Sequence, residues 1–328
     1  MDDFQEILYN RILDLTACIH VPLKLFAMYI VATKTPNNQR HGSYFILDIM
    51  FWNFIVNLVF AFAHLYPMYP AECFRLDGPI SHFIDNESFG HVMYILMFGD
   101  MINCALALLY AFPYRYVVFA HPDLADKIKP KWVFIFCGVL HVVIPLLFLP
   151  FGANWMISYN EYPNKAELPP KELLFCFYPS GPKKILPLMM FFLFSLICLV
   201  VFMAFVVLIY RNIRRNKGII LESTLKIQRR VLLNLAVLTG IVLCFAGIPM
   251  VIAVVMTWFP GVLYAQTITM VCIVVLTNHG AVYAITSLIM IKSYRYAVKQ
   301  IFWRLIPAAL KEQNFFVHVH VIVPSTTN

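Results

Sequence analysis

The sequence predicts an all-α membrane protein built as a bundle of seven transmembrane helices. Seven long apolar stretches support this fold class, and each reaches the ~20 residues that a helix needs to cross ~30 Å of hydrocarbon. The composition agrees, because 61% of the residues are hydrophobic and 13% are charged, against about 45–50% and 25% in soluble domains. A transmembrane β-barrel would show alternating segments of about ten residues, a pattern that this sequence lacks. The apolar stretches are residues 10–32, 45–68, 90–112, 132–152, 185–210, 231–258 and 265–291.

The chain of 328 residues has the length of one helical bundle with short connections. We therefore expect residues 1–291 to form the bundle and residues 292–328 to form a cytoplasmic tail. Residues 294–310 mix basic and large apolar side chains, which is typical of a helix in the headgroup layer of a membrane, with a solvated tail as the alternative. The net charge is +8, but the basic residues gather in loops between the spans. This pattern indicates a lipid bilayer as partner rather than a nucleic acid.

Loops that are rich in Lys and Arg alternate along the chain with loops that contain few of them. Lys and Arg are concentrated in the loops after the first, third, fifth and seventh apolar stretches, whereas the lysines of loop 153–184 run against the pattern. Positive residues stay on the cytoplasmic side during insertion, so we expect the N-terminus outside the cell and the C-terminus in the cytoplasm. The start of the chain carries Asp2, Asp3 and Glu6 and lacks the positive region of a cleaved signal peptide. We expect the first helix to be an uncleaved anchor.

Two features of the predicted outside loops agree with this orientation. Asn86-Glu87-Ser88 is an N-glycosylation sequence, and it lies just before the third helix. Cys73 and Cys176 lie in loops of the oxidising outside compartment, so we expect them to form a disulfide, with two unpaired thiols as the alternative. The other cysteines lie within helices, where cysteine behaves as a small apolar residue.

The longer loops and the prolines suggest how the bundle is closed and how it moves. Residues 153–184 contain several prolines, which favours a rigid, extended cover over the outer mouth of the bundle. Residues 211–230 are basic and compatible with helix, so we expect the fifth and sixth helices to extend past the membrane. Pro249, with Gly240 and Gly247 nearby, permits a kink in the sixth helix. This helix is a candidate lever for signal transmission, with packing alone as the alternative.

Ionisable side chains inside the membrane cost about 2.5–3.5 kcal/mol each at mid-depth and therefore need a partner or a function. Lys24 and Asp48 are predicted at comparable depths in the first and second helices. We expect them to form an ion pair, as a structural clamp or as part of a switch. Asn53 and Asn57 are four residues apart on one face of the second helix, and we expect them to hydrogen-bond to neighbouring helices.

Polar residues of the third helix suggest a ligand site. Asp100 and Asn103 lie near mid-depth on one face. A buried carboxylate there either binds a cationic or hydrogen-bonding ligand or binds a proton and stays neutral. The alternative is an internal polar network with Asn278 or His279 of the seventh helix. His91 and Tyr94 lie nearer the outer end, on the path of an entering ligand, although such histidines also serve structural roles. The predicted ligand-binding residues are Asp100, Asn103, His91, Tyr94 and His279.

The sequence does not favour an enzyme. It lacks the G-x-S-x-G, P-loop and H-E-x-x-H motifs, and its intramembrane histidines are scattered over four helices rather than gathered as metal ligands. We therefore expect no catalytic residue, no metal and no cofactor. A ligand-gated channel or transporter is the alternative function, although the chain shows neither an interrupted helix pair nor an internal repeat.

Six short motifs follow one another along nearly all of the apolar stretches. They are His20-Val21-Pro22, Lys34-Thr35-Pro36, Pro113-Tyr114-Arg115-Tyr116, Thr224-Leu225-Lys226-Ile227-Gln228-Arg229-Arg230, His279-Gly280 and Lys292-Ser293-Tyr294-Arg295. In this order they resemble the nematode serpentine chemoreceptors, most closely class H of the Str superfamily. Ser293 stands where that family usually has proline.

This resemblance implies a G-protein-coupled, odorant-type receptor in the cell membrane of ciliated sensory neurons, including the sensory cilium. Its expected partners are a small external ligand and a heterotrimeric G protein. By analogy, Arg115 would hold the resting state or meet the G protein, with an interfacial anchor as the alternative. A seven-helix protein that no longer signals is a further alternative. The other residues expected to meet the G protein are Arg211, Arg214, Arg215, Arg229 and Arg230.

Overall fold

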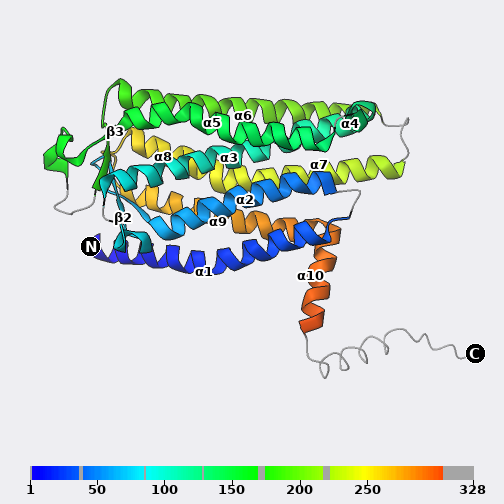
Figure 1. Ribbon diagram of the computed structural model, residues 1–328, viewed down its shortest axis with the longest axis horizontal. Helices are drawn as coiled ribbons and strands as arrows, with labels where there is room; N and C mark the ends of the chain where they lie inside the picture. The colour runs from blue at the N-terminus through cyan, green and yellow to red at the C-terminus, as the bar shows by residue number, and fades with distance from the viewer. Residues whose placement is uncertain are drawn as a thin grey trace, which may run out of the picture.

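Seven helices long and apolar enough to cross a membrane form the body of the protein. The computed structural model describes residues 2–36, 40–84, 86–127, 129–168, 174–216 and 222–305, and these seven spans are counted over those residues. Figure 1 shows them side by side as one elongated bundle. The predicted fold class is confirmed. The spans are α1 (Asp2–Lys34), α2 (Arg40–Ala63), α3 (Glu87–Ala120), α5 (Pro130–Trp155), α6 (Pro182–Arg215), α7 to α8 (Glu222–Trp258) and α9 (Ala265–Met290).

The packing of the spans follows from how much of each is buried. Helix α3 packs against α2, α5 and α6, and helix α9 packs against α1, α2, α7 and α8. Of the seven spans, α9 is the most buried and α6 the least. Since α6 is also the most apolar span, its outer surface suits the hydrocarbon of a bilayer, where helix packing needs no polar shell.

The sixth span is a single rod made of three pieces. Helix α7 (Glu222–Val242) passes into a π-helical turn, η5 (Leu243–Gly247), and then into α8 (Ile248–Trp258). Pro249 lies at the start of α8 and has no N–H to donate to the carbonyl four residues earlier, inside η5. A π turn is one of the ways in which a helix accommodates such an interruption. The helix breaker predicted at Pro249 thus coincides with a change of helical register.

The second span ends earlier than its hydropathy predicts. Helix α2 stops at Ala63, and His64 takes a positive φ of 41°, whereas the prediction extended the helix to residue 68. Residues Leu65–Pro67 instead form the strand β1, all three of which are buried. A buried strand is as apolar as a membrane helix, so hydropathy alone does not separate the two. The predicted boundary of residues 45–68 is therefore wrong at its second end.

A small antiparallel sheet closes one end of the bundle. Its strand order is β1 (Leu65–Pro67), β2 (Cys73–Leu76), β4 (Leu174–Phe177) and β3 (Met156–Ile157). The register places Cys73 opposite Cys176, and these two residues form a disulfide. Short 3-10 helices complete the cover: η2 (Pro79–His82), η3 (Tyr159–Glu161) and η4 (Lys165–Glu167). We call this end, defined by β1–β4, the sheet end.

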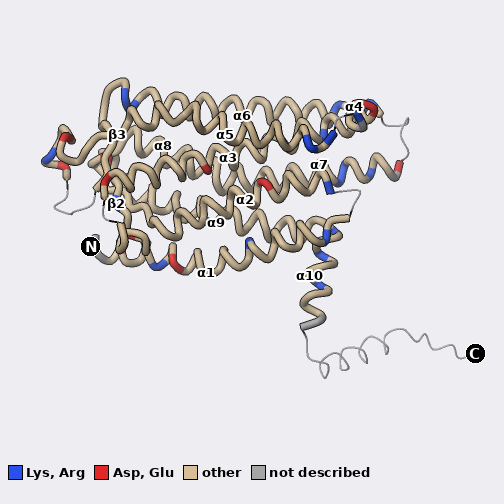
Figure 2. The backbone as a smooth tube through the Cα atoms, in the orientation of Figure 1, with Lys and Arg blue, Asp and Glu red and all other residues tan. Residues whose placement is uncertain are grey.

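The opposite end carries most of the positive charge. Figure 2 shows Lys and Arg gathered where α6 ends, α7 begins and α4 (Pro122–Lys127) lies. Both long helices extend past the apolar stretches, as predicted, with α6 running to Arg215 and α7 starting at Glu222. We call this end the basic end and define it by five exposed arginines. They are Arg211, Arg214, Arg215, Arg229 and Arg230.

Helix α10 (Lys292–Leu305) follows α9 and turns away from the bundle at the basic end, as Figure 1 shows. A hydrogen bond of 2.9 Å joins the hydroxyl of Tyr294 to that of Thr35, the residue that follows α1. The range of α10 overlaps the interfacial helix predicted at residues 294–310. Residues 306–328, including the rest of that predicted helix and of the tail, lie outside the described residues.

Candidate functional site

A cavity of about 390 Å³ lies in the half of the bundle nearer the sheet end. Helices α3, α5, α6 and α8 form its walls, and Phe177 of strand β4 also lines it. Most of its surface comes from aromatic and aliphatic side chains, among them Phe98, Phe148, Trp155 and Phe191. A mostly apolar cavity of this size with few polar groups is typical of a small-molecule site.

Asp100 is the charged group of this cavity. Its side chain lines the cavity and is buried, and no residue of the described part of the chain forms a hydrogen bond or ion pair with it. A carboxylate in apolar surroundings needs a hydrogen-bond donor or a cation to offset its desolvation. The arrangement therefore suits a ligand that brings an N–H or ammonium group to Asp100.

Asn103 also lines the cavity, but its side chain already has a partner. Its Oδ1 lies 3.0 Å from Nδ1 of His141 on α5, whose Nε2 lies 3.0 Å from Oδ2 of Asp48 on α2. His141 thus bridges the second, third and fourth spans. The internal network predicted as the alternative role of Asn103 exists, but with His141 rather than with Asn278, whose amide donates to the carbonyl of Val274 within α9.

The predicted pair of Lys24 and Asp48 is wrong, because each has another partner. Lys24 is buried, and its Nζ donates to the backbone carbonyl of Asn53 at 3.0 Å, while Asp48 lies beside His141. The depths of the two residues are comparable, but depth does not determine how each helix is rotated about its axis, and therefore not which neighbour each side chain faces. A Cβ added at Gly280 of α9 would collide with the Lys24 ammonium. The ammonium is therefore packed between α2 and α9.

Asn57 binds a neighbouring helix, as its predicted role requires. Its Nδ2 donates to the carbonyl of Thr277 on α9 at 2.8 Å. For Asn53 the predicted role is wrong, because its Oδ1 and Nδ2 have no hydrogen-bond partner among the described residues. Its backbone carbonyl instead accepts from Lys24. These contacts hold α1, α2 and α9 together at mid-depth, where interhelical hydrogen bonds contribute roughly 0.6 kcal/mol on average.

The remaining predicted ligand residues divide between cavity and scaffold. Tyr94 lines the cavity, with its ring 4.6 Å from that of Phe177. His91 instead places its Nε2 2.9 Å from the carbonyl of Cys176 and so holds strand β4 against α3. His279 lies outside this cavity, and its Nδ1 bonds to the carbonyl of Leu276. The cavity thus brings together three of the five predicted residues: Asp100, Asn103 and Tyr94.

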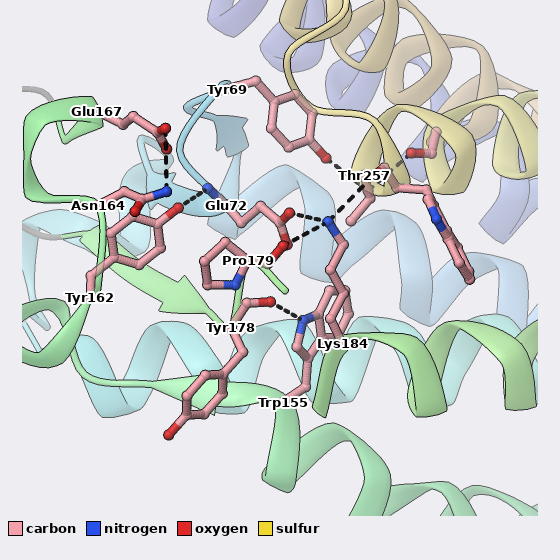
Figure 3. Close-up of polar contacts among 12 residues, drawn as sticks. Tyr69, Glu72, Trp155, Tyr162, Asn164, Glu167, Tyr178, Pro179, Lys184 and Thr257 are labelled. Atoms are coloured by element: carbon pink, nitrogen blue, oxygen red, sulfur yellow. Dashed lines mark hydrogen bonds and ion pairs between the residues drawn. The ribbon is translucent and has the colours of Figure 1, made fainter. Parts of the chain in front are cut away.

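A buried ion pair, which the sequence analysis missed, ties the cover to the helices around the cavity. Lys184 of α6 pairs with the carboxylate of Glu72, and its Nζ also bonds to the carbonyls of Pro179 and Trp258 at 3.2 and 3.4 Å (Figure 3). Burial raises the pKa of Glu72 to about 7, although the nearby Lys184 lowers it in part. In the sequence, this pair is indicated by the position of Glu72 directly before Cys73, because the disulfide with Cys176 brings this part of the chain to β4.

A second contact connects the cover to the cavity wall. The hydroxyl of Tyr69 lies 2.8 Å from that of Thr257, and Thr257 lines the cavity (Figure 3). The hydroxyl of Tyr162 accepts a hydrogen bond of 3.0 Å from the backbone N–H of Glu72. Loops of the sheet end are therefore bonded to the same helix, α8, that lines the cavity.

Asn86 serves as the N-cap of α3. Its Oδ1 accepts a hydrogen bond of 2.9 Å from the backbone N–H of Ser88. Asparagine at an N-cap stabilises a helix because it satisfies one of the free N–H groups of the first turn. Asn86 is exposed at the sheet end. Its role as an N-cap does not test the predicted glycosylation, which stays a prediction.

Arg115 differs from the exposed arginines of the basic end. Its guanidinium packs against α2, where a Cβ added at Gly42 would collide with it. Among the described residues, no carboxylate forms an ion pair with Arg115. The side chain is thus half-buried near the basic end, unlike the five exposed arginines there.

The comparison with protein families agrees with this architecture. A family model described as "Serpentine type 7TM GPCR chemoreceptor Srh" matches residues 5–304. The match includes nearly all of α1 and every later membrane span. No curated protein matches the chain.

Proposed function

The chain belongs to the Srh family of serpentine seven-transmembrane GPCR chemoreceptors, and on this premise we propose that it binds a small external molecule beside Asp100 and activates a heterotrimeric G protein at its basic end. The carboxylate of Asp100, which lies inside an apolar cavity and has no partner in the described part of the chain, carries the ligand part of this proposal. The protein is a multi-pass membrane receptor, and we place it in the cell membrane and cilium of a sensory neuron.

The ligand that fits this cavity is a compact apolar molecule with an amine or another hydrogen-bond donor. The volume of about 390 Å³ falls within the range of small-molecule sites. Phe98, Phe148 and Phe191 offer apolar contact, and Asp100 offers one fixed acceptor. Charge-assisted hydrogen bonds are about twice as strong as neutral ones, which favours an amine over an alcohol.

The proposed orientation places the sheet end outside the cell. The Cys73–Cys176 disulfide lies there, and disulfides persist in oxidising compartments. The exposed arginines lie at the other end, in agreement with the retention of positive charge in the cytoplasm. A ligand from outside would then meet the covered cavity, while the arginines face the G protein.

The sixth span connects the two sites. Met250, Val254 and Thr257 of α8 line the cavity, and the same rod continues through η5 into α7, which carries Arg229 and Arg230. A ligand that contacts α8 more favourably in one position of this rod than in another would shift the population toward that position. Only such differential binding produces a signal.

Coupling is tested by replacing Arg214, Arg215, Arg229 and Arg230 together with Gln. We expect the second-messenger response to be lost while surface expression is retained. The matched control replaces the same four residues with Lys, which preserves the charge that directs topology. An intact response of the Gln variant would place the coupling surface elsewhere, and a ligand-evoked current with G proteins blocked would favour a channel.

Ligand binding is tested with a panel of small apolar amines and alcohols of the same carbon skeletons. For an amine that activates the wild type, we expect Asp100→Asn to raise the half-maximal concentration by about tenfold or more, since a buried charge pair contributes more than 1.4 kcal/mol. The response to alcohols should change less. Equal losses for amines and alcohols would contradict a direct contact between Asp100 and the amine.

A further inference from the structure

A second cavity, of about 550 Å³, lies deeper in the bundle than the Asp100 cavity. It is formed by α3, α6, α9 and the continuous helix made of α7, η5 and α8. Nearly all of its surface is apolar, and among the described residues that line it none is acidic. Its ligand chemistry therefore differs from that of the cavity that contains Asp100.

The mouth of this second cavity faces the hydrocarbon. Side chains that line the cavity and are also exposed include Leu199 of α6 and Leu243, Ile248 and Val251 of η5 and α8. The opening thus lies between α6 and the η5–α8 segment, where both helices present apolar side chains suited to lipid. A molecule dissolved in the bilayer reaches this opening without passing through water.

The inner wall of the cavity carries two buried polar side chains, each with one atom that has no hydrogen-bond partner among the described residues. His279 and Thr239 both line the cavity and are 4% and 0% exposed. In the described part of the chain, neither Nε2 of His279 nor Oγ1 of Thr239 has a hydrogen-bond partner. Buried polar atoms of native proteins are nearly always paired, so two such atoms in one cavity indicate a missing group.

The chemistry of these two atoms defines that group. The Nδ1 of His279 bonds to the carbonyl of Leu276, and a carbonyl only accepts, so Nδ1 carries the hydrogen. Nε2 of the uncharged ring is then an acceptor, whereas the hydroxyl of Thr239 both donates and accepts. A hydroxyl group matches both atoms in kind, because it donates to an acceptor such as Nε2 and accepts from a donor such as the hydroxyl of Thr239.

We infer that this cavity is a binding site for a membrane-dissolved alcohol, with its apolar body between α6 and α8 and its hydroxyl at His279 and Thr239. The site is distinct from the Asp100 cavity, but Phe191 and Met250 line both. An occupant of the second cavity restricts these two side chains and thereby changes the affinity of the Asp100 cavity for its own ligand. By linkage, a ligand in the Asp100 cavity changes the affinity for the alcohol by the same factor.

The site is tested with full-length protein in lipid nanodiscs and two photoreactive probes, a diazirine-bearing hexadecanol and the corresponding diazirine-bearing hexadecane. Cross-linked positions are mapped by mass spectrometry. We expect the alcohol to label α6 and η5–α8 saturably, with about fivefold or greater preference over the alkane, which corresponds to about 1 kcal/mol. Equal labelling by the two probes would mean nonspecific contact with lipid-facing helices and would overturn the proposal.

Two kinds of variant locate the bound alcohol. Thr239→Val removes the hydroxyl with little change of shape and should reduce the preference for the alcohol toward that of the alkane. Cys198 lines the cavity, so Cys198→Trp should fill it and abolish saturable labelling. The matched control is Ile197→Trp, at an exposed neighbouring position outside the cavity lining. Unchanged labelling of folded Cys198→Trp would place the alcohol elsewhere.

Discussion

Lys184 at the start of α6 forms a buried ion pair with Glu72, which lies just before strand β2. The pair joins the cover of the sheet end to a membrane helix, and the Lys184 ammonium also reaches the carbonyl of Trp258 at the end of α8. Three parts of the chain that are far apart in sequence therefore meet at one nitrogen. Removing one partner of such a pair leaves an uncompensated buried charge.

Stability should fall as pH rises from about 5 to 8 because of Glu72. Its folded-state pKa is raised to about 7 from an ordinary value of 4.5, chiefly by burial, with the charge of Glu167 adding to the increase. The native state therefore holds this proton more tightly than the unfolded state. The stabilisation is fully present below pH 4.5 and is lost as pH passes through about 7. At about 1.4 kcal/mol per pH unit between pH 4.5 and about 7, it amounts to at most about 3.5 kcal/mol.

The measurement compares apparent melting temperatures of wild type and Glu72→Gln in detergent across this pH range. The difference between the two proteins is used because His64, whose pKa is lowered by burial, acts in the opposite direction as pH falls. We expect the wild type to lose its relative advantage as pH rises. Parallel pH profiles would show that Glu72 does not titrate in this range.

The Cys73–Cys176 disulfide should stabilise the cover. The bond closes a loop with a sequence separation of 103 residues, and removing a native disulfide typically costs about 2–5 kcal/mol. We expect Cys73→Ala, Cys176→Ala and the double variant to lower the melting temperature equally. Reductant should destabilise the wild type and leave the variants unchanged. Cys18→Ser, at an exposed free cysteine, is the control.

Gly280→Ala should destabilise the bundle because α9 approaches Lys24 and Asn53 closely at this residue. An added Cβ would collide with the Lys24 ammonium and the Asn53 side chain, and such overpacking typically costs about 1–3 kcal/mol. Gly240→Ala is the matched control, since a Cβ there meets no atom within 4 Å among the described residues. That change should be neutral or stabilise α7 by up to about 1 kcal/mol. Thermal unfolding that ranks the two variants in the reverse order would contradict this packing.

His141 and Asp48 should be energetically coupled across α5 and α2. Their atoms Nε2 and Oδ2 lie 3.0 Å apart, and interhelical hydrogen bonds in membranes contribute about 0.6 to 1.7 kcal/mol. A double-mutant cycle of His141→Leu and Asp48→Ala should give a coupling energy in this range. The same cycle with Asp48→Ala and Thr257→Val should be additive within about 0.5 kcal/mol. A coupling energy near zero for His141 and Asp48 would show that the bond contributes nothing.

The membrane spans could be predicted because their length and apolar character follow directly from the thickness of the hydrocarbon layer. Some bounds differ, since α1 begins at Asp2 and α3 continues to Ala120, and the end of α2 differs in kind. Leu65 and Tyr66 continue the apolar run but belong to strand β1, since the sheet is buried as well. The extension of α6 and α7 beyond the membrane was predicted from helix-compatible basic residues, which hydropathy alone would have assigned to a loop.

The candidate site could be predicted only in part. Asp100, Asn103 and Tyr94 line the same cavity. Asp100 and Asn103 are three residues apart and therefore share a face of α3, whereas Tyr94 has no such spacing to either of them. His141 lies on a different helix, and no local spacing connects it with Asn103 or Asp48. Depth suggested that Lys24 would meet Asp48, but the packed helices turn these side chains toward different neighbours.

By itself, the sequence determined the class of the protein: the number of spans, their approximate bounds and the charge asymmetry between loops. Each of these depends on transfer of a segment between water and hydrocarbon, which is a local property of composition. The tertiary structure alone decided which side chains share a cavity, which polar atoms lack partners and which loops cover the bundle. These depend on the rotation of each helix about its axis, and packing against all of its neighbours sets that rotation.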